Sequence, residues 1–448
     1  MKGSIVAKFG GSSLADGQQF QKVKKIILEK EERRVIVPSA PGKRHNKDHK
    51  VTDLLYMCHQ LASHLLSFDE VFQILEERYL EIARDLNLKV PISEALKNIK
   101  ENISKGATRD YCASRGEYLN GLILADYLNA KFMDASEIIR FHPNGQFLPK
   151  ETEELVKKRM QNAGRVVVPG FYGADEEGNI KTFSRGGSDV TGSILAQGIE
   201  ASLYENWTDV SGFLMADPKI VKNPRTIKEI TYKELRELSY MGAPVLHEEA
   251  IFPVRGLGIP IQIRNTNAPE EEGTLIVEDL HREPSPYIIT GLAGKKDFTV
   301  ITVEKTQMNG EKGFLRKLVS VFEANEVTIE HTPSSIDSVS VIVSEKEMNG
   351  KLSKIMEEIR IYLNPDQVSA QGKLALLAVV GRGMIATKGV SARVFTALYQ
   401  RGINIRMISQ GASELNILIG LENDDFESAI EAIYEAFTEK GEETHENL

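Results

Sequence analysis

The chain carries a lysine and two adjacent glycines near its start, in the run Lys8-Phe9-Gly10-Gly11-Ser12-Ser13. Two glycines without Cβ atoms let the backbone approach a bulky anion, and a helix that begins soon afterwards can direct its free N–H groups at the same anion. A lysine just before this turn can neutralise charge on a phosphoryl group during its transfer. The spacing matches neither a P-loop nor a dinucleotide fingerprint. The run therefore predicts a phosphate site of another kind, with an ordinary tight turn as the structural alternative.

Two further turns could complete this chemistry. Ser184-Arg185-Gly186-Gly187-Ser188-Asp189 opens a helix-like stretch, and Thr208-Asp209 follows a strand that ends near Trp207. Open α/β sheets build their sites where strands end and helices begin, so we expect the three segments to meet. Phosphoryl transfer depends on positioning and charge stabilisation. A lysine, two glycine turns and a carboxylate that tolerates magnesium would provide both.

The elements that must position these turns indicate a parallel sheet covered by helices. Strand, helix and strand are expected at residues 4–9, 20–30 and 34–38, and this alternation is typical of α/β domains. From about 51 to 130 the pattern becomes helical, which predicts a helical excursion from the sheet domain. Strand signals return at 165–169 and 201–207.

The C-terminal part contains an approximate internal repeat that begins after a boundary near residues 281–286. Each half is expected to fold as strand, helix, strand, strand, at 299–304, 313–325, 327–332 and 338–344, then at 374–380, 389–401, 403–410 and 414–421, with a last helix at 425–437. The pattern predicts two small α+β units in tandem, and thus domains at 1–285, 286–370 and 371–448.

Composition limits the classes of partner. The 448 residues exceed what one hydrophobic core can hold, and the formal charge of -9 argues against nucleic-acid binding. No leader or bilayer-spanning apolar run is evident, and Cys58 and Cys112 read as free thiols. We therefore expect a cytoplasmic protein without a membrane partner. The basic run at 42–50 is expected to be a mobile loop, or alternatively a lid over an anionic substrate.

Taken together, the motifs resemble those of the aspartokinases, within the amino acid kinase family. The resemblance rests on the three turns above, on Arg115-Gly116-Glu117, and on residues 407–417, which are similar to the second of two regulatory ACT domains. It covers nearly the whole chain and suggests the monofunctional form. It implies an αβα sandwich around a mainly parallel sheet, followed by two ferredoxin-like α+β ACT domains.

The resemblance also implies an activity: ATP- and Mg²⁺-dependent phosphorylation of the L-aspartate side chain to 4-phospho-L-aspartate, the first step toward lysine, threonine and methionine. Lys8 would stabilise the transferring phosphoryl group, and Asp189 would orient the positive groups around it. The residues implied to line the nucleotide site are Lys8, Gly10, Gly11, Ser12, Thr208, Asp209, Leu214, Asp217, Lys219, Pro244 and Val245. Leu214 and Pro244 depart from the family pattern, in which a tyrosine and a lysine are frequent at these positions.

Aspartate needs a cation for its carboxylates and an anion for its ammonium. Arg185 can grip a carboxylate with two hydrogen bonds, and Glu117 can receive the ammonium. The resemblance adds five residues to this pocket: Ser39, Thr52, Gly186, Gly187 and Ser188. Structural alternatives exist for some of these, since Arg115 and Glu117 could form a helix-surface pair and Thr52 could be a helix cap. His247 is expected to be structural, because an ionised carboxylate substrate needs no base.

The tandem units are implied to bind a feedback effector, which would be lysine, threonine or both. The segment that matches the effector pocket contains Met308, Phe314, Leu315, Ile329, Glu330, Ser334 and Ser335. Glu330 favours lysine modestly, although as an isolated residue it could equally be a solvated strand position. Small sheets with open edges favour pairing between chains, so we expect a homodimer or homotetramer. The alternatives are a glutamate-type amino acid kinase and a catalytically silent amino-acid sensor.

Overall fold

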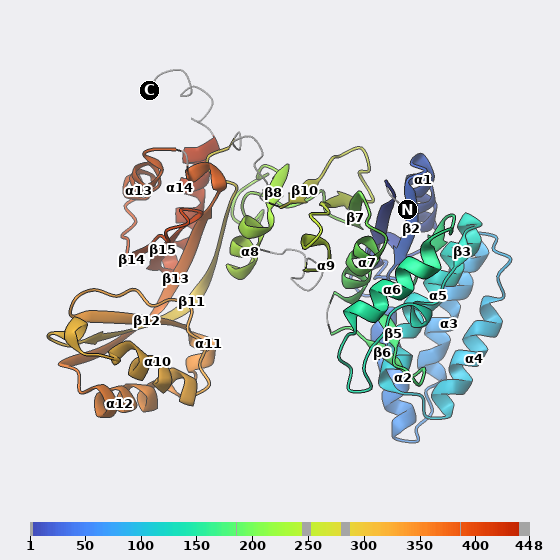
Figure 1. The fold of residues 1–448 in the computed structure, drawn as a ribbon, viewed down its shortest axis with the longest axis horizontal. Helices are drawn as coiled ribbons and strands as arrows, with labels where there is room; N and C mark the ends of the chain where they lie inside the picture. The colour runs from blue at the N-terminus through green and yellow to red at the C-terminus, as the bar shows by residue number, and fades with distance from the viewer. Residues whose placement is uncertain (1–2, 185, 244–251, 279–286, 386, 439–448) are drawn as a thin grey trace, which may run out of the picture. The chain divides into compact units, whose positions relative to one another are not determined.

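The computed structural model describes residues 3–184, 186–243, 252–278, 287–385 and 387–438 (Figure 1). The chain divides into two compact units. The first comprises Met1–Phe213, Thr226–Tyr232 and Val245–His281, and the second comprises Leu214–Arg225, Lys233–Pro244 and Arg282–Leu448. The second unit thus includes two short segments that precede the boundary expected near residue 285.

The first unit is built on an eight-stranded sheet with the order β3-β4-β2-β1-β7-β9-β10-β8. The strands are β1 (Ile5–Phe9), β2 (Arg33–Pro38), β3 (Lys131–Phe132), β4 (Val166–Val167), β7 (Leu203–Thr208), β8 (Glu229–Thr231), β9 (Ile261–Asn265) and β10 (Thr274–Val277). Neighbours pair in parallel except β9 with β10. The predicted mainly parallel sheet is confirmed, and its central strands bring the ends of β1, β2 and β7 to one edge.

Helices and one hairpin surround this sheet. They are η1 (Gly11–Leu14), α1 (Gly17–Glu29), α2 (Val51–Ser63), α3 (Asp69–Asp85), α4 (Ile92–Ser104), α5 (Arg109–Leu128), η2 (Ala135–Glu137), α6 (Pro149–Met160), α7 (Gly187–Gly198) and α9 (Phe252–Arg255), with the hairpin β5 (Tyr172–Ala174) and β6 (Ile180–Thr182). Helices α2 to α5 form the predicted excursion. None of the helices in the described ranges combines the length and hydropathy that a bilayer crossing requires.

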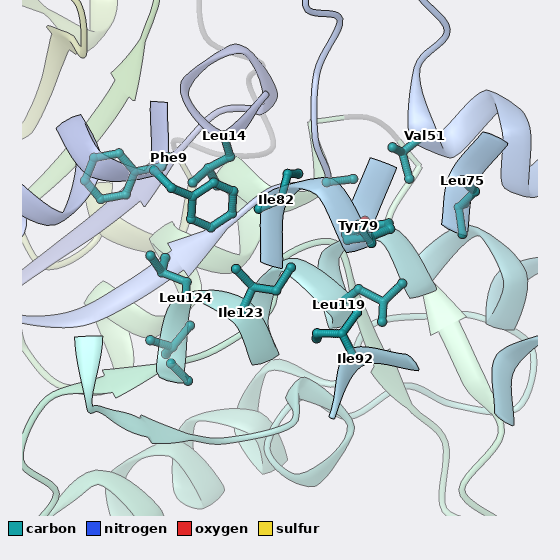
Figure 2. Packing of buried hydrophobic residues seen from close by; sticks show 14 of the residues in the cluster. Phe9, Leu14, Val51, Leu75, Tyr79, Ile82, Ile92, Leu119, Ile123 and Leu124 are labelled. Atoms are coloured by element: carbon teal, nitrogen blue, oxygen red, sulfur yellow. The ribbon is translucent and has the colours of Figure 1, made fainter. Parts of the chain in front are cut away.

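The core of the first unit joins the sheet to the helical excursion. Figure 2 shows Phe9 and Leu14 packed near Ile82, Ile123 and Leu124, which come from α3 and α5. Each fully buried side chain of this size stabilises the fold by about 1.5–3 kcal/mol. Because the strand that carries Lys8 also contributes to this core, the position of the lysine is fixed by packing.

The second unit contains a five-stranded antiparallel sheet with the order β12-β11-β13-β15-β14. Its elements are α8 (Tyr232–Tyr240), β11 (Gly291–Glu304), η4 (Met308–Gly310), α10 (Phe314–Ala324), β12 (Ser338–Ser344), α11 (Glu345–Met348), α12 (Leu352–Leu363), β13 (Gln367–Val380), η5 (Arg382–Met384), α13 (Val390–Gln400), β14 (Met407–Ser409), β15 (Asn416–Glu422), η6 (Asn423–Asp425) and α14 (Phe426–Thr438). Of α8, only Tyr232 belongs to the first unit.

Three local expectations for this unit were wrong. The stretch 327–332 forms no regular strand, but makes isolated bridges such as His331 with Ile342. Helix α12 was not anticipated, although Ile355, Ile359 and Leu363 give it a buried face. Strand β13 is longer than expected, since it begins at Gln367 rather than at residue 374.

Candidate active site

The predicted phosphate turn lies directly after the central strand β1. The N–H of Gly10 donates to the carbonyl of Trp207 at the end of β7 (2.9 Å), and the N–H of Gly42 donates to the carbonyl of Gly11 (2.7 Å). A Cβ added at Gly11 would come within 2.9 Å of the Ala40 carbonyl oxygen, so this position needs glycine. The turn is therefore held between β2 and β7, and its backbone is fixed in one conformation.

The expected helix follows the turn, but a short 3₁₀ helix that was not expected precedes it. The short η1 comes first, and α1 begins only at Gly17. Asp16 caps α1 by accepting a hydrogen bond from the N–H of Gln19 (2.9 Å). A carboxylate at this cap stabilises the helix by about 0.5–2 kcal/mol. The cap thus satisfies one of the first N–H groups of α1 within the chain.

Trp207 supports the turn from the neighbouring strand. Its ring stacks on Phe9 with centroids 5.9 Å apart, and its indole N–H donates to the buried carboxylate of Glu205 (2.9 Å). Arg33 and Arg264 place their guanidinium carbons 5.2 and 4.6 Å from the indole ring centroid. Together, these contacts of Trp207 anchor β7 beside β1.

Lys8, Asp189 and Asn206 form a closed polar triangle at the end of the sheet. The Lys8 Nζ lies 2.6 Å from Asp189 Oδ1 and 3.2 Å from Asn206 Oδ1, while Asn206 Nδ2 donates to Asp189 Oδ1 (2.8 Å). The two predicted catalytic residues therefore meet across 181 positions of sequence. Asn206 was missed, and its only sequence signal was its place two residues before Thr208.

The glycine turn before α7 packs against a second loop. Gly186 has a φ of 58° and precedes the first residue of α7, Gly187. A side chain at Gly187 would collide with Phe171, which itself has a φ of 79° and donates its N–H to Thr191 Oγ1 (3.0 Å). A bulky residue at positive φ is rare and marks a strongly determined position. Phe171 was not predicted from the sequence.

Glu117 and Arg115 are both buried in α5, so the alternative of a helix-surface pair is wrong. The Arg115 guanidinium carbon lies 4.5, 4.5 and 5.2 Å from the ring centroids of Tyr111, Tyr118 and Tyr172. Burial raises the pKa of Glu117 to about 8, although hydrogen bonds from backbone N–H groups and the charge of Arg115 oppose the rise. Glu117 Oε2 has no hydrogen-bond partner within the described residues. A buried carboxylate of this kind is suited to receive a cation.

The loop after β2 runs close to α5. The N–H of Ser39 donates to the Phe9 carbonyl (3.0 Å), and the Ser39 carbonyl accepts from Asn120 Nδ2 (2.7 Å). A Cβ at Gly116 would lie 2.7 Å from that of Ala40, so α5 approaches this segment closely. Thr52 lies inside the first turn of α2, whose cap position is Lys50, and the alternative of a Thr52 cap is therefore wrong.

The basic run at 42–50 is held by ion pairs to α3. Arg78 is buried and contacts Asp48 Oδ2 at 2.7 Å, and Arg44 contacts the same oxygen at 3.0 Å. Burial would raise the pKa of Asp48, but hydrogen bonds from Arg44 and the charge of Arg78 lower it well below its usual value. Arg78 also donates to the carbonyls of Ala15 and Gly42, which flank the phosphate turn. These contacts argue against both a freely mobile loop and a lid.

The predicted nucleotide residues fall into three groups. Thr208 ends β7 and donates its hydroxyl to Asp209 Oδ1 (3.1 Å). The second unit contains Leu214, Asp217 and Lys219, where Asp217 accepts from the Lys219 N–H (2.9 Å). The third group, Pro244 and Val245, lies outside the described residues, as do Arg185 of the predicted substrate pocket and His247, which was expected to be structural. No group of three or more His, Cys, Asp or Glu side chains in the described part of the chain could hold a metal ion.

The predicted effector segment lies in the second unit. Met308 and Phe314 are buried, and Leu315 is exposed. The Glu330 Oε2 accepts a hydrogen bond of 2.5 Å from the hydroxyl of Tyr240 in α8. Burial and this carboxylate raise the pKa of Tyr240 to about 12. Ile329, Ser334 and Ser335 lie along the same irregular stretch as Glu330, and Ser334 bridges to Val339.

Two family models match this sequence. The model described as the amino acid kinase family covers residues 3–265, and a model described as an ACT domain covers residues 377–437.

Relatives match along nearly the full length. Aspartokinase 3 of Bacillus subtilis is 38% identical, over 96% of this chain and 98% of its own length. The crystal structure of Clostridium acetobutylicum aspartate kinase, described as an allosteric enzyme, has 55% identity and a TM-score of 0.92 over 97% of this chain and 100% of that one. Two structures of E. coli aspartokinase III, with aspartate and ADP or with lysine and aspartate, have TM-scores of 0.69 and 0.72, 25% identity, and coverage of 97% and 99%.

Proposed function

This chain belongs to the amino acid kinase family and, within it, to the aspartokinases, and we propose that Lys8, Asp189 and Glu117 carry its activity. The reaction is the ATP-dependent phosphorylation of the side-chain carboxylate of L-aspartate, giving 4-phospho-L-aspartate. A carboxylate oxygen of aspartate attacks the γ-phosphorus, and ADP leaves with the electrons of the broken P–O bond. Aspartate is already ionised at neutral pH, so no general base is required.

The observation that carries this assignment is the placement of the Lys8 ammonium. It lies at the carboxyl end of the central strand, against the Gly10–Gly11 turn and 2.6 Å from Asp189. A fixed cation at this point stabilises negative charge as it develops on the phosphoryl oxygens. Asp189 keeps the ammonium oriented through this contact, and in this role it is a positioning residue.

For the aspartate pocket we propose Glu117 as the partner of the substrate ammonium. Its buried Oε2, which has no hydrogen-bond partner within the described residues, would be paired when the substrate ammonium enters. Arg185 would take a carboxylate of the substrate, and four neighbours would complete the pocket with hydroxyl and backbone groups. These are Ser39, Thr52, Ser188 and the Gly186–Gly187 backbone.

The phosphate turn fits a nucleotide, because its two glycines present backbone without side chains beside the Lys8 ammonium, and a Cβ at Gly10 would lie 3.6 Å from Lys8 Nζ. Gly10, Gly11 and Ser12 would line the phosphates, and Thr208 and Asp209 would lie toward the ribose, with Leu214, Asp217, Lys219, Pro244 and Val245 as further candidates. We propose that Mg²⁺ enters with the nucleotide. Mg²⁺ typically binds phosphates and water with one or two carboxylates, which agrees with the lack of a larger ligand cluster in the described part of the chain. When bound, it would neutralise phosphate charge.

Regulation is proposed to act through the second unit, with lysine as the effector that pairs its ammonium with Glu330. Threonine, alone or together with lysine, is the second candidate, because its α-ammonium could use the same carboxylate. Inhibition would be a population shift toward an arrangement that binds the effector better. We further propose a homodimer or homotetramer in the cytoplasm, in which the edge strand β14 of the five-stranded sheet is available for pairing.

An ADP-release assay with ATP, Mg²⁺ and either L-aspartate or L-glutamate tests the proposal. We expect turnover with aspartate and none with glutamate. Equal turnover with glutamate would contradict the assignment of the substrate pocket, and no turnover with either acid would favour the sensor alternative. Repeating the assay with lysine and threonine, singly and together, identifies the effector.

A further inference from the structure

We propose that Asn206 is a positioning residue for phosphoryl transfer, which holds Lys8 and Asp189 in their working geometry through both ends of its amide. This inference rests on the proposed role of Lys8. It goes further by assigning a function to a residue that none of the recognised motifs contains.

The sheet register brings the two side chains together. Lys8 and Asn206 are paired residues of the parallel strands β1 and β7, so their side chains lie on the same face of the sheet. Asn206 is only 4% exposed, and its neighbour Trp207 fixes the strand by stacking on Phe9. The amide therefore has little freedom to turn away.

The chemistry of the partners determines how the amide is oriented. A lysine ammonium only donates and an ionised carboxylate only accepts. The amide oxygen must therefore face Lys8 (3.2 Å), and the amide nitrogen must face Asp189 (2.8 Å). Leucine would satisfy neither partner, and aspartate could not donate to Asp189. Among side chains of this size, asparagine is the one that completes the triangle without adding charge.

This neutral bridge becomes important when Lys8 acts. The ammonium has three N–H donors, and it must direct hydrogen bonds to the phosphoryl oxygens as negative charge develops there. Asp189 Oδ1 would then lose part of its pairing in a site where the Lys8 and Asp189 side chains are 10% and 20% exposed. Leaving such a carboxylate without a partner is costly. Asn206 continues to donate to it, and so lowers the cost of releasing the ammonium toward the substrate.

The test compares Asn206→Leu and Asn206→Asp with Tyr204→Phe. Tyr204 is a matched control because it lies on the same strand and donates to the backbone carbonyl of Asp189 (3.0 Å) rather than to the carboxylate. Steady-state kcat, KM for aspartate and the melting temperature are measured for each variant across pH. Wild-type turnover with aspartate is measured first, and its absence would refute the proposed function rather than this inference.

Asn206→Leu is expected to lower kcat about 10- to 100-fold, because a misplaced ammonium loses alignment with the reacting group, while KM for aspartate stays within about twofold. In Asn206→Asp, a second carboxylate would hold Lys8 on the protein. Its kcat relative to wild type is expected to rise as pH falls, since two adjacent carboxylates share a proton at low pH. Tyr204→Phe should retain kcat within about twofold.

Two results would overturn the inference. One is a wild-type kcat in Asn206→Leu. The other is a result in which kcat and the melting temperature fall together in both Asn206 variants, while the kcat of Asn206→Asp divided by the kcat of wild type does not change with pH. The second result would indicate a purely structural asparagine.

Discussion

The two ends of the active site differ in how their charges are balanced before substrate arrives. At the phosphoryl end, Lys8 and Asp189 are paired with each other and bridged by Asn206. At the aspartate end, Glu117 is buried, and its Oε2 has no partner within the described residues. The phosphoryl end is preorganised, whereas the aspartate end reaches charge balance only with its ligand. Catalysis and substrate affinity therefore depend on different residues, and variants at the two ends should differ in whether kcat or KM changes.

The largest effect should come from removing the cation of the preorganised end. Lys8→Ala is expected to lower kcat about 1,000-fold, because the fixed cation beside the phosphate turn is lost, while aspartate affinity measured by calorimetry changes little. Lys22→Ala, an exposed lysine on α1, is the control and should keep wild-type turnover. Near-normal turnover in Lys8→Ala would remove Lys8 from the mechanism.

The opposite kinetic signature is expected at the aspartate end. Glu117→Gln should raise KM for aspartate about 10- to 100-fold with a smaller change in kcat, because the substrate ammonium loses a buried charged partner. The free variant should be more stable than wild type near pH 8. Folding raises the pKa of Glu117. Its contribution to the free energy of unfolding of wild type is therefore fully present below the ordinary pKa of 4.5 and declines as pH rises toward about 8.

Chemical denaturation at pH 4.5 and pH 8 measures this difference, with Glu94→Gln on the exposed side of α4 as the control. An unchanged KM, or a stability difference that does not depend on pH, would contradict the assignment of Glu117.

The pH dependence of wild type sharpens the same contrast. Glu117 must be ionised to bind an ammonium, and its pKa is about 8 in the free protein. Arg115 from the same helix and Tyr79 from α3 are the groups that interact with it. The apparent affinity for aspartate should therefore rise about tenfold per pH unit between pH 6 and 7.5 and level off above pH 8. Affinities measured by calorimetry that stay flat over this range would show that Glu117 does not bind the ammonium.

The smallest effect is expected in the effector segment. There the carboxylate of Glu330 already accepts a hydrogen bond from the neutral hydroxyl of Tyr240. An effector ammonium must compete with this hydroxyl. Tyr240→Phe is expected to lower the inhibition constant for lysine about 2- to 10-fold, the worth of one such hydrogen bond, without changing uninhibited kcat. Tyr362→Phe, an exposed tyrosine on α12, serves as the control. Weaker inhibition in Tyr240→Phe would mean that the hydroxyl contributes to effector binding.

Local patterns predicted the parts of the fold and site that depend on residues near one another in sequence. The turn after Lys8, the glycines before Asp189 and the helical excursion around Glu117 all follow from spacing and residue type. Asn206 could not be predicted in this way, because its role depends on the register of two strands that are distant in sequence. The strained backbone at Phe171 depends likewise on Gly187, which packs against it.

The errors in the second unit have a similar physical cause. The stretch after Val327 has the composition of a strand, yet it meets its neighbour only at isolated bridges, since pairing depends on the partner strand as well as on local propensity. The pairing of Glu330 with Tyr240 joins residues 90 positions apart and had no local signal.

Trp207 has a practical consequence, since it is the one tryptophan in the sequence. Its indole lies on Phe9, and its carbonyl holds Gly10. The tryptophan fluorescence of the protein, excited selectively over that of the tyrosines, therefore originates one residue away from Asn206. Emission from this ring can report nucleotide arrival at the turn in real time, without an attached dye, and can be followed by stopped flow in each variant.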